Sequence, residues 1–305
     1  MDAHLRRDQH HGVWDRSLVP VIRVASGATV VMDVQDASGG QLSRHSEAQD
    51  VARLDLGRVN PVTGPIYIED AEPGDVIRVT ILDIAPDNWG WTANIPGFGL
   101  LADQFPDPHL LVSQLAGSYV VTPLGVSLPV EPFVGTIGLA PGEPGPHSLI
   151  PPRRVGGNLD MRHLTTGARL FLPVEVPGGL LSLGDCHACQ GDGEVCGTAV
   201  EISASVTLRV DLLKQRPLRF PMVETHPVAD RRGPALVTTG IGPDLFEAAR
   251  QAALGMVEEL VRRTRLAAVD AYCLASVAGD LKIAEVVDAP HWVVAMHFER
   301  ALLDL

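Results

Sequence analysis

Proline and glycine interrupt this chain so often that long helices can form in only a small part of it. The 305 residues include 24 prolines and 30 glycines. They are densest in the runs WGWTANIPGFGLLADQFPDPHLL and EPFVGTIGLAPGEPGPHSLIPPRRVGGNLD. Because proline lacks a backbone donor and glycine has no side chain to pack, we expect neither helices nor long strands there. Long loops in a compact protein usually cover something, so these runs are candidates for covering a site.

Strand patterns surround this middle region. VPVIRVASGATVVMDVQDA (19–37) has valine-rich runs on either side of Ser26-Gly27, which predicts two strands joined by a tight turn. GPIYIEDAEPGDVIRVTILDI (64–84) predicts a strand, a Glu-Pro-Gly-Asp turn and a second strand of alternating pattern. The chain is therefore expected to be mainly β.

One helical region follows near the C-terminus. Apolar side chains recur at helical spacing after Pro243, which suits the first helical position, and we expect this stripe to face the core. Its members are Phe246, Ala249, Ala253, Met256, Leu260 and Val261. Residues 269–277 predict a second helix, and residues 283–287 and 292–297 predict strands. The pattern gives an α+β chain, mainly β, with a helical pair near its end.

Composition narrows the class of partner. The formal net charge is −13 and 46% of the residues are hydrophobic, so the chain can bury a large core but lacks the clustered cations of a nucleic-acid binder. We expect a small neutral or cationic ligand and no nucleic acid.

The cellular location is predicted from the cysteines and the apolar runs. Three of the four cysteines lie between Cys186 and Cys196, which is unlike the framework of a disulfide-rich secreted domain. The first twenty residues have charges where a signal peptide needs an apolar run, and no apolar segment reaches the roughly 18 residues of a membrane span. A cytoplasmic protein without membrane partners is expected.

The stretch GDCHACQGDGEVCGTAVE (184–201) contains the densest set of reactive side chains. In an extended strand Asp185 and His187 project to the same side, where they form part of a ligand set for a cation such as Zn²⁺. Glycines on both sides of Asp192 allow a sharp bend that directs Asp192 and Glu194 into one cavity. A carboxylate there can act as a general base towards water.

Other interpretations of the same stretch remain open at this point. QGDG can be a polar hairpin turn. Cys186 and Cys189 form a C-x-x-C pair, although the redox motif requires a helix N-terminus. A structural zinc knuckle would use Cys186, His187, Cys189 and Cys196, and Cys189 beside His187 can also be an acyl-forming nucleophile.

Four blocks resemble one known family. GGNLDMRHLTTGARLFLPVEVPGGLLSLGDCHACQGDGEVCGTAVE is similar to the signature region of the acetamidase/formamidase family. PVIRVASGATVVMDVQDASGGQL, GPIYIEDAEPGDVIRVTILDI and VEPFVGTIGLAP resemble its other blocks in the same order. The resemblance extends over residues 14–288. It implies a single mostly-β domain covering residues 1–305, a large sandwich or barrel-like fold with a helical pair, assembled into homo-oligomers.

The same resemblance implies a function. It predicts an amidase that releases ammonia from short amides such as formamide or acetamide, or opens γ-lactams, with a bound divalent metal, often zinc. The implied metal ligands are Asp36, Asp185 and His187, with Glu194 as general base and Asp192 as the second choice. Gln190, Gln41, Glu69 and His147 are candidates for substrate binding. The alternatives are a Cys189-dependent amidase and an inactive protein that binds small amides.

Overall fold

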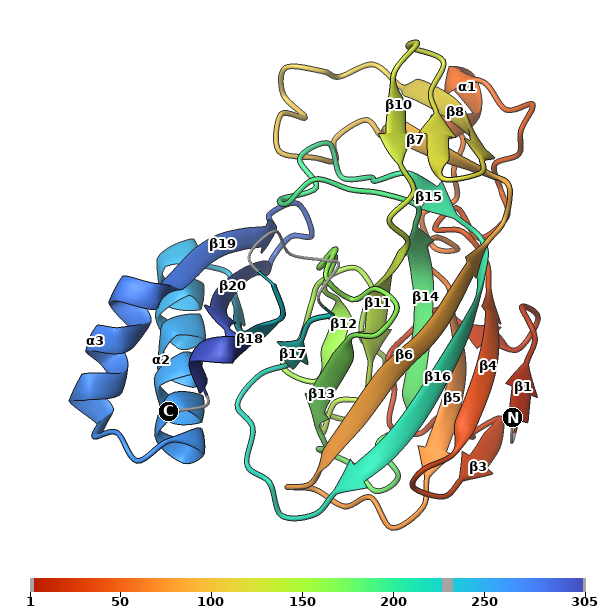
Figure 1. The fold of residues 1–305 in the computed structure, drawn as a ribbon. Coiled ribbons are helices and arrows are strands. Elements are labelled where there is room, and N and C mark those ends of the chain that lie inside the picture. Colours follow the sequence, from red (N-terminus) through yellow and green to blue (C-terminus); the bar gives the residue numbers. More distant parts are fainter. Residues whose placement is uncertain (1–2, 227–232, 304–305) are drawn as a thin grey trace.

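The fold is built from two large β-sheets that pack face to face (Figure 1). The computed structural model describes residues 3–226 and 233–303. The prediction of a mainly β chain with a helical pair near its end is confirmed. No helix within the described ranges has the length and apolar character needed to cross a membrane.

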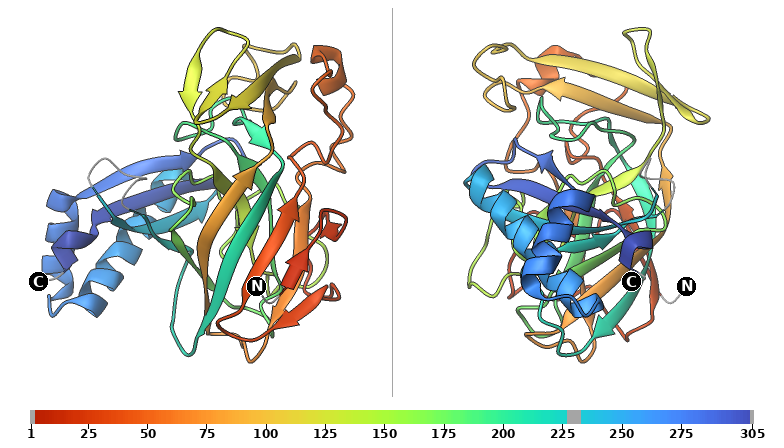
Figure 2. Two further views of the ribbon diagram at one scale, coloured as in Figure 1. Left: turned by 45° about the vertical axis from the view of Figure 1, so that its right-hand side comes forward. Right: turned by 60° about the vertical axis from the view of Figure 1, so that its left-hand side comes forward.

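The first sheet extends from the N-terminal strand to the C-terminal helices. Its described strands, in spatial order, are β1 (Ala3–Leu5), β4 (Thr29–Val34), β16 (Ala204–Leu213), β6 (Val76–Pro86), β13 (Arg169–Pro173), β17 (Met222–Glu224), β18 (Ala235–Gly242), β20 (Trp292–Glu299) and β19 (Gly279–Glu285). The last three strands carry α2 (Leu245–Arg263) and α3 (Ala268–Ala278), followed by a 3₁₀ turn at Arg300–Leu303. We call β18–β20 with these helices the C-terminal lobe; it projects to one side of the sandwich (Figure 2).

The second sheet continues beyond the sandwich as a ribbon of strands. Its main path is β10 (Ser127–Pro129), β9 (Tyr119–Val121), β8 (His109–Ala116), β7 (Trp89–Asn94), β15 (Glu201–Ile202), β14 (Leu181–His187), β11 (Phe133–Gly138) and β12 (Gly156–Asn158). β5 (Val62–Ile68) pairs with β14 and joins β2 (His10–His11) and β3 (Ile22–Val24) to it. The short helix α1 (Ala48–Val51) lies near β7 and β8.

The main core fills the space between the two sheets. On β4 every second side chain, Val30, Met32 and Val34, is fully buried, as expected for a strand with one face towards the core. Leu183 and Cys186 of β14 contribute from the opposite sheet. β14 is buried along its whole length, so polar side chains on it must find partners inside the protein.

The two predicted N-terminal strand pairs exist, but each pair is divided between the sheets. β3 and β4 flank Gly27, whose φ of 93° suits the predicted turn. β3 nevertheless pairs with β5, whereas β4 pairs with β1 and β16. β5 and β6 likewise lie in different sheets. These turns therefore connect the two layers of the sandwich.

Within the described residues, the proline- and glycine-rich runs contain no helix and only short strands, as predicted: β7 and β11 have six residues each and β12 has three, and β8 begins at the end of the first run. Glycine occurs in these strands because neighbouring backbones come very close. A Cβ on Gly90 would lie 2.6 Å from the carbonyl oxygen of Glu201, and one on Gly138 would lie 2.5 Å from the amide nitrogen of Gly157. The remaining parts of these runs are loops, as predicted.

Both C-terminal helices are confirmed, with a correction to the face that α2 buries. Asp244 caps α2 by accepting a hydrogen bond from the Glu247 amide, so Pro243 precedes the cap. Phe246 is 73% exposed, and Val261 is also exposed. The buried residues are Ala248, Ala252, Met256, Glu259 and Leu260. Small residues are needed because a Cβ on Gly240 of β18 would lie only 1.9 Å from the Ala248 carbonyl oxygen.

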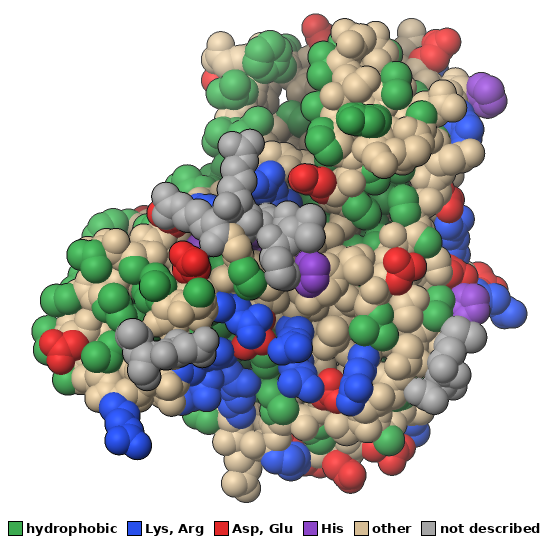
Figure 3. All heavy atoms as spheres, viewed as in Figure 1, with side chains coloured by type: hydrophobic (Ala, Val, Ile, Leu, Met, Phe, Trp, Pro, Cys, Tyr) green, Lys and Arg blue, Asp and Glu red, His purple; other side chains and the backbone are tan. Residues whose placement is uncertain are grey.

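Charged side chains gather where the C-terminal lobe meets the sandwich. In Figure 3, Lys and Arg side chains form a band across this junction. Several of these arginines pair with buried glutamates of α2 and β17.

Candidate active site

Strand β14 brings a histidine and an aspartate into a buried polar cluster. The Nε2 atom of His187 lies 3.1 Å from Oδ1 of Asp185, and Cys186 between them points into the core. β15 pairs with β14 so that Glu201 lies directly opposite His187. Its Oε2 atom is 3.0 Å from the same imidazole nitrogen. Three side chains from two adjacent strands therefore converge on one point.

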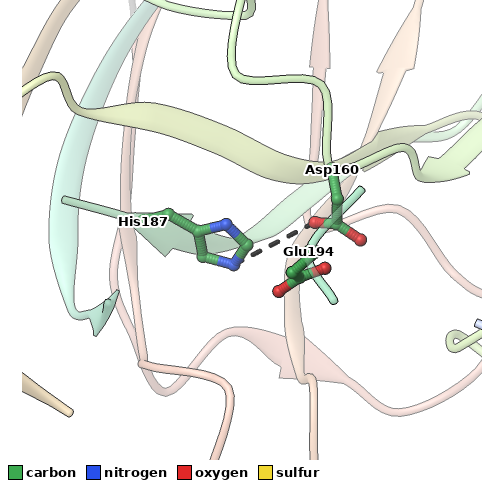
Figure 4. A group of neighbouring side chains, drawn as sticks. All are labelled: Asp160, His187 and Glu194. Carbon is green, nitrogen blue, oxygen red and sulfur yellow. Dashed lines mark ion pairs between the residues drawn. The ribbon is translucent and has the colours of Figure 1, made fainter. Parts of the chain in front are cut away.

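Two further carboxylates reach the imidazole from loops (Figure 4). Asp160 follows β12, and its Oδ1 atom lies 4.0 Å from Nε2 of His187. Glu194 lies on the loop between β14 and β15. One ligand atom each from Asp160, His187 and Glu194 lies within 4.8 Å of the other two. Asp185, His187 and Glu201 form a second group of this kind around the same imidazole.

The backbone is held in an uncommon conformation at three of these acids. Asp160, Asp185 and Glu194 have φ values of 42°, 52° and 46°, a region that non-glycine residues rarely adopt and that concentrates at functional sites. Gly135 of β11 makes room for them, because a Cβ there would lie 2.5 Å from Oδ1 of Asp160. The surrounding fold therefore fixes the positions of the carboxylates.

The tautomer of His187 follows from its other nitrogen. The Gln190 side-chain nitrogen donates to the carbonyl oxygen of Asp160 at 2.8 Å, which turns Oε1 of Gln190 towards Nδ1 of His187 at 2.8 Å. Nδ1 must then carry the proton. This arrangement leaves Nε2 facing the carboxylates, and it is the orientation used by metal-ligating histidines.

The C-terminal lobe adds two more buried acids. The Glu285 carboxylate accepts hydrogen bonds from the amides of Val287 and Asp288, the second at 2.6 Å. Asn158 donates to Oδ2 of Asp288 at 2.6 Å. Gly193, next to Glu194, pairs with Glu285 through its backbone. The lobe is thus attached to the loop that carries Glu194.

Burial raises most of the acid pKa values, and the positive charge of His187 only partly opposes it. Burial, followed by the charge of Asp160, raises the pKa values of Glu194 and Asp288 well above the usual range. Burial raises the pKa of Glu201 and of Glu285 to about 8 and that of Asp160 to about 6. Without a further positive charge, most of these acids therefore keep their protons near neutral pH.

His187 and Asp185 are the exceptions. Burial opposes the charged form of each, but their mutual attraction prevails. The carboxylates of Glu201 and Asp185 raise the pKa of His187 well above its usual value, and His187 lowers the pKa of Asp185.

The donor set fits a divalent cation. Both carboxylate oxygens of Asp160 are buried without a hydrogen-bond partner among the described residues, an arrangement that costs free energy unless something else binds there. One neutral imidazole nitrogen with several carboxylate oxygens is the ligand chemistry of zinc and similar metals.

Of the ligands predicted from sequence, the structure brings Asp185 and His187 together and places Asp36 elsewhere. Asp36 is buried, and its Oδ1 atom accepts hydrogen bonds from the Ser38 hydroxyl and from the Trp91 indole. It belongs to neither group of candidate ligands. Asp36 therefore braces the wall of the site through Trp91.

The other predicted residues lie around the cluster or away from it. Gln190 orients His187, and Gln41 bonds to the backbone of Ser38 and Asp55. Glu69 pairs with Arg23 on the surface, and the His147 ring contacts the carbonyl oxygen of Glu143. Asp192 is exposed and pairs with Arg162 at 3.2 Å. Of the two predicted bases, Glu194 and not Asp192 lines the cavity of about 310 Å³ beside the acid cluster.

The cysteines lack the properties that the alternative interpretations require. Cys186, Cys189 and Cys196 are free thiols. Burial raises the pKa of Cys189 to about 11 and raises that of Cys186 further, so neither forms a thiolate readily. This disfavours a redox pair, a zinc knuckle and a cysteine nucleophile.

Four acids of the site were missed from sequence: Asp160, Glu201, Glu285 and Asp288. Asp160 and Glu201 lie inside the quoted signature segment, so proximity to the motif was an available signal. Glu285 and Asp288 lie about a hundred residues downstream of His187, and only the packing of the lobe brings them close.

A cavity opens above the acids. Its volume is about 310 Å³, and its floor is formed by Asp160, Asp185, Glu194, Glu201 and Asp288. Asn60 also lines it, and the side-chain oxygen of Asn60 is buried without a hydrogen-bond partner among the described residues. A small polar group bound there can therefore contact carboxyl groups of these acids and the unused acceptor of Asn60.

Comparison with known proteins gives consistent matches over nearly the whole chain. The model of the acetamidase/formamidase family matches residues 2–149 and 145–304. A formamidase of Methylophilus methylotrophus is 29% identical over 322 aligned residues, with 83% of this chain and 79% of that protein covered.

Solved structures agree with these matches. The crystal structure of an acetamidase from Bacillus halodurans superposes with a TM-score of 0.92 at 34% identity, covering 99% of this chain and 98% of the other. A γ-lactamase from Delftia acidovorans superposes with a TM-score of 0.70 at 25% identity, covering 98% and 90%.

Proposed function

Because this chain belongs to the acetamidase/formamidase family and is an amidase, we propose that it hydrolyses carboxamides at a divalent metal held by the buried cluster around His187. The observation that supports this is the convergence of Asp185, His187 and Glu201, beside Asp160 and Glu194, on the floor of a cavity. The products are a carboxylate and ammonia.

In this proposal the metal ligands are Asp185, Glu201 and Nε2 of His187, and zinc is the ion that such a set suits best. Glu201 replaces Asp36 in the set expected from sequence. When bound, the ion would polarise the amide carbonyl and make water a better nucleophile at neutral pH. Gln190 holds the imidazole in the tautomer that leaves Nε2 free.

Glu194 is the proposed general base. It is 7% exposed and lines the cavity. Burial raises its pKa, and the charge of a bound divalent ion would favour the ionised carboxylate that a general base requires. Its carboxylate takes a proton from the attacking water and returns it to the departing nitrogen, which is needed because an amide anion is a poor leaving group. The side-chain oxygen of Asn60 is placed to accept a hydrogen bond from the substrate NH₂ group.

Metal removal tests the proposal. Dialysis against a strong chelator is expected to reduce ammonia release from formamide and acetamide to the background rate, and Zn²⁺ or another divalent ion is expected to restore it. Metal analysis of the same samples gives the stoichiometry and the identity of the ion. Full turnover by a preparation without metal would contradict the metal-dependent mechanism.

γ-Lactams are a second substrate class, which the superposition on the Delftia acidovorans γ-lactamase supports. Opening of γ-butyrolactam gives an amino acid without free ammonia, so chromatography of the product distinguishes it from linear amide hydrolysis. An inactive amide-binding protein would show calorimetric binding and neither product; the set of buried acids speaks against this alternative.

We also propose that the chain forms one domain and assembles into homo-oligomers. The unbroken path of the first sheet into the C-terminal lobe supports a single domain. Exposed apolar side chains on α3 and β19, among them Val269, Tyr272, Val277 and Leu281, support contacts between copies. Light scattering after size-exclusion chromatography measures the assembly, and the cytoplasmic location stays a prediction.

A further inference from the structure

The cavity above the acids is larger and more apolar than formamide or acetamide requires. Its floor is acidic, but the walls are lined by Leu54, Val59, Trp91, Ile95, Phe98 and Ile150. A volume of about 310 Å³ is at the lower end of the range for pockets that hold much larger organic ligands. Acetamide would fill only the polar end.

One wall is a loop held in place by its own polar contacts. Gln41 accepts a hydrogen bond from the Asp55 amide at 2.9 Å and donates to the Ser38 carbonyl oxygen at 2.8 Å. The amide of Asn60 donates to the Ala37 carbonyl oxygen at 2.7 Å. These bonds tie the two ends of the loop together and hold Leu54 and Val59 beside the cavity.

A second part of the lining is built directly on the loop that carries Glu194. A Cβ on Gly197 would lie 2.4 Å from the Phe98 ring, and one on Gly99 would lie 2.6 Å from the Cys196 carbonyl oxygen. The Leu100 amide donates to the Val195 carbonyl oxygen at 3.0 Å. Glycines at 99 and 197 thus let Phe98 pack close to the catalytic loop, so its position relative to Glu194 is fixed.

Trp91 supplies a further apolar surface of the lining. It is almost completely buried, and its indole nitrogen donates to Oδ1 of Asp36 at 2.9 Å. Because that bond satisfies the only polar atom of the side chain, what Trp91 adds to the lining is apolar. Asp36 therefore has a part in shaping the cavity.

We propose that this cavity selects primary amides with an apolar acyl group of about five to eight carbon atoms, and that Phe98 and Leu54 determine this specificity. The inference rests on the proposed amidase function and adds the substrate class. The carboxamide reaches the acids at the floor while the acyl chain displaces water from the walls. Each buried methylene is expected to raise kcat/KM about three- to fourfold, equivalent to about 0.8 kcal/mol.

The test is a series of primary amides: formamide, acetamide, butyramide, hexanamide and phenylacetamide. We expect kcat/KM for ammonia release to rise along the linear series, by at least thirtyfold from acetamide to hexanamide. Equal or falling values beyond acetamide would overturn the inference while leaving the amidase function intact. N-Methylacetamide and N-pentylacetamide test the alternative that the cavity holds the amine side, and a preference for the latter over hexanamide would also overturn it.

A pair of phenylalanines on one loop provides a matched control. Phe98→Ala is expected to lower the ratio of kcat/KM for hexanamide to that for formamide about tenfold, within the range for contacts in an apolar pocket. Phe105→Ala changes an exposed ring that does not line the cavity, so the ratio should not change. Equal ratios in wild type and Phe98→Ala would contradict the role of Phe98.

Binding measured without turnover separates the two proposals. Calorimetry of the Glu194→Gln variant with acetamide and hexanamide probes the cavity even where no amide is hydrolysed. At least tenfold tighter binding of hexanamide supports the apolar site; equal affinities would overturn it. Absence of ammonia from every amide with wild-type protein would instead refute the proposed reaction.

Discussion

Glu224 of β17 and Glu259 of α2 are about as buried as Glu194 and Glu201 in the cavity, yet the surroundings of the two pairs are opposite. Arg263 bonds to Glu224 at 2.9 Å and to Glu259 at 3.0 Å. Arg262 adds a second contact to Glu259 at 2.6 Å. Burial opposes ionisation, but these arginines prevail and lower the pKa values of both glutamates.

Within the residues that the structure describes, neither Glu194 nor Glu201 forms an ion pair with an arginine or lysine, and the nearby cation is His187. Burial has the largest influence on the pKa of each glutamate and raises both values. The comparison shows that burying a glutamate does not set its charge state; the neighbouring cations do. A fold that can pair buried glutamates with arginine at the lobe leaves the acids of the cavity without such partners. That contrast supports an external cation at the site.

The largest effect is expected from neutralising the proposed base. Glu194→Gln should lower kcat for ammonia release by about 10²- to 10⁴-fold, the usual contribution of general base catalysis, with the metal content unchanged if Asp185, His187 and Glu201 are the ligands, as proposed. Asp192→Asn alters the exposed carboxylate on the same loop and should leave kcat within about twofold. The reverse result would assign the base to Asp192.

The arginine-paired cluster is expected to contribute to stability. Glu259→Gln removes charged hydrogen bonds to Arg262 and Arg263, and it should lower the free energy of unfolding by about 1.5–3 kcal/mol. Urea denaturation followed by circular dichroism measures the change. Glu258→Gln serves as the control, because Glu258 is more exposed and pairs with Arg219 at the surface. An unchanged urea midpoint for Glu259→Gln would contradict the prediction that this cluster stabilises the protein.

Neutralising an acid in the cavity should instead increase the free energy of unfolding. In metal-free protein at pH 7.5, Asp160→Asn removes a buried charge whose pKa is raised to about 6 by burial and by the charge of Asp185, and we expect the free energy of unfolding to rise by about 1–2 kcal/mol. Metal affinity should fall, since that charge helps to attract the ion. If Asp160→Asn destabilises the metal-free protein, the attraction of His187 and hydrogen bonds from the protonated carboxyls of Asp288 and Glu194 outweigh the cost of burying this charge.

The smallest effect concerns pH. Because the folded pKa of Glu259 lies below its ordinary value of 4.5, its contribution to stability is present above pH 4.5 and is lost as the pH falls through the folded value. The glutamine introduced by Glu259→Gln does not titrate. The difference in urea midpoint between wild type and this variant should therefore narrow as the pH is lowered from about 6 to about 3. A constant difference would mean that packing, and not charge, accounts for it.

Local pattern predicted much of the secondary structure. The spacing after Pro243 identified α2, although Phe246 proved exposed, because the face of a helix that packs on Gly240 depends on the sheet below it. The runs around Gly27 identified β3 and β4 but not their separation into two sheets. Glycines that argued against long strands, such as Gly90 and Gly138, occur in short strands, where they allow neighbouring backbones to approach closely.

Three features could be predicted from the amino-acid sequence: the family, the mainly β class and the nearness of Asp185 to His187. The last follows because two residues on one face of a strand are neighbours whatever the rest of the chain does. Folding in three dimensions was needed to place Glu201 opposite His187, to bring Asp160 and Asp288 into the cluster and to bond Asp36 to Trp91. These contacts depend on strand register and on the docking of the C-terminal lobe. Both are set by packing between segments distant in sequence, which no local pattern encodes.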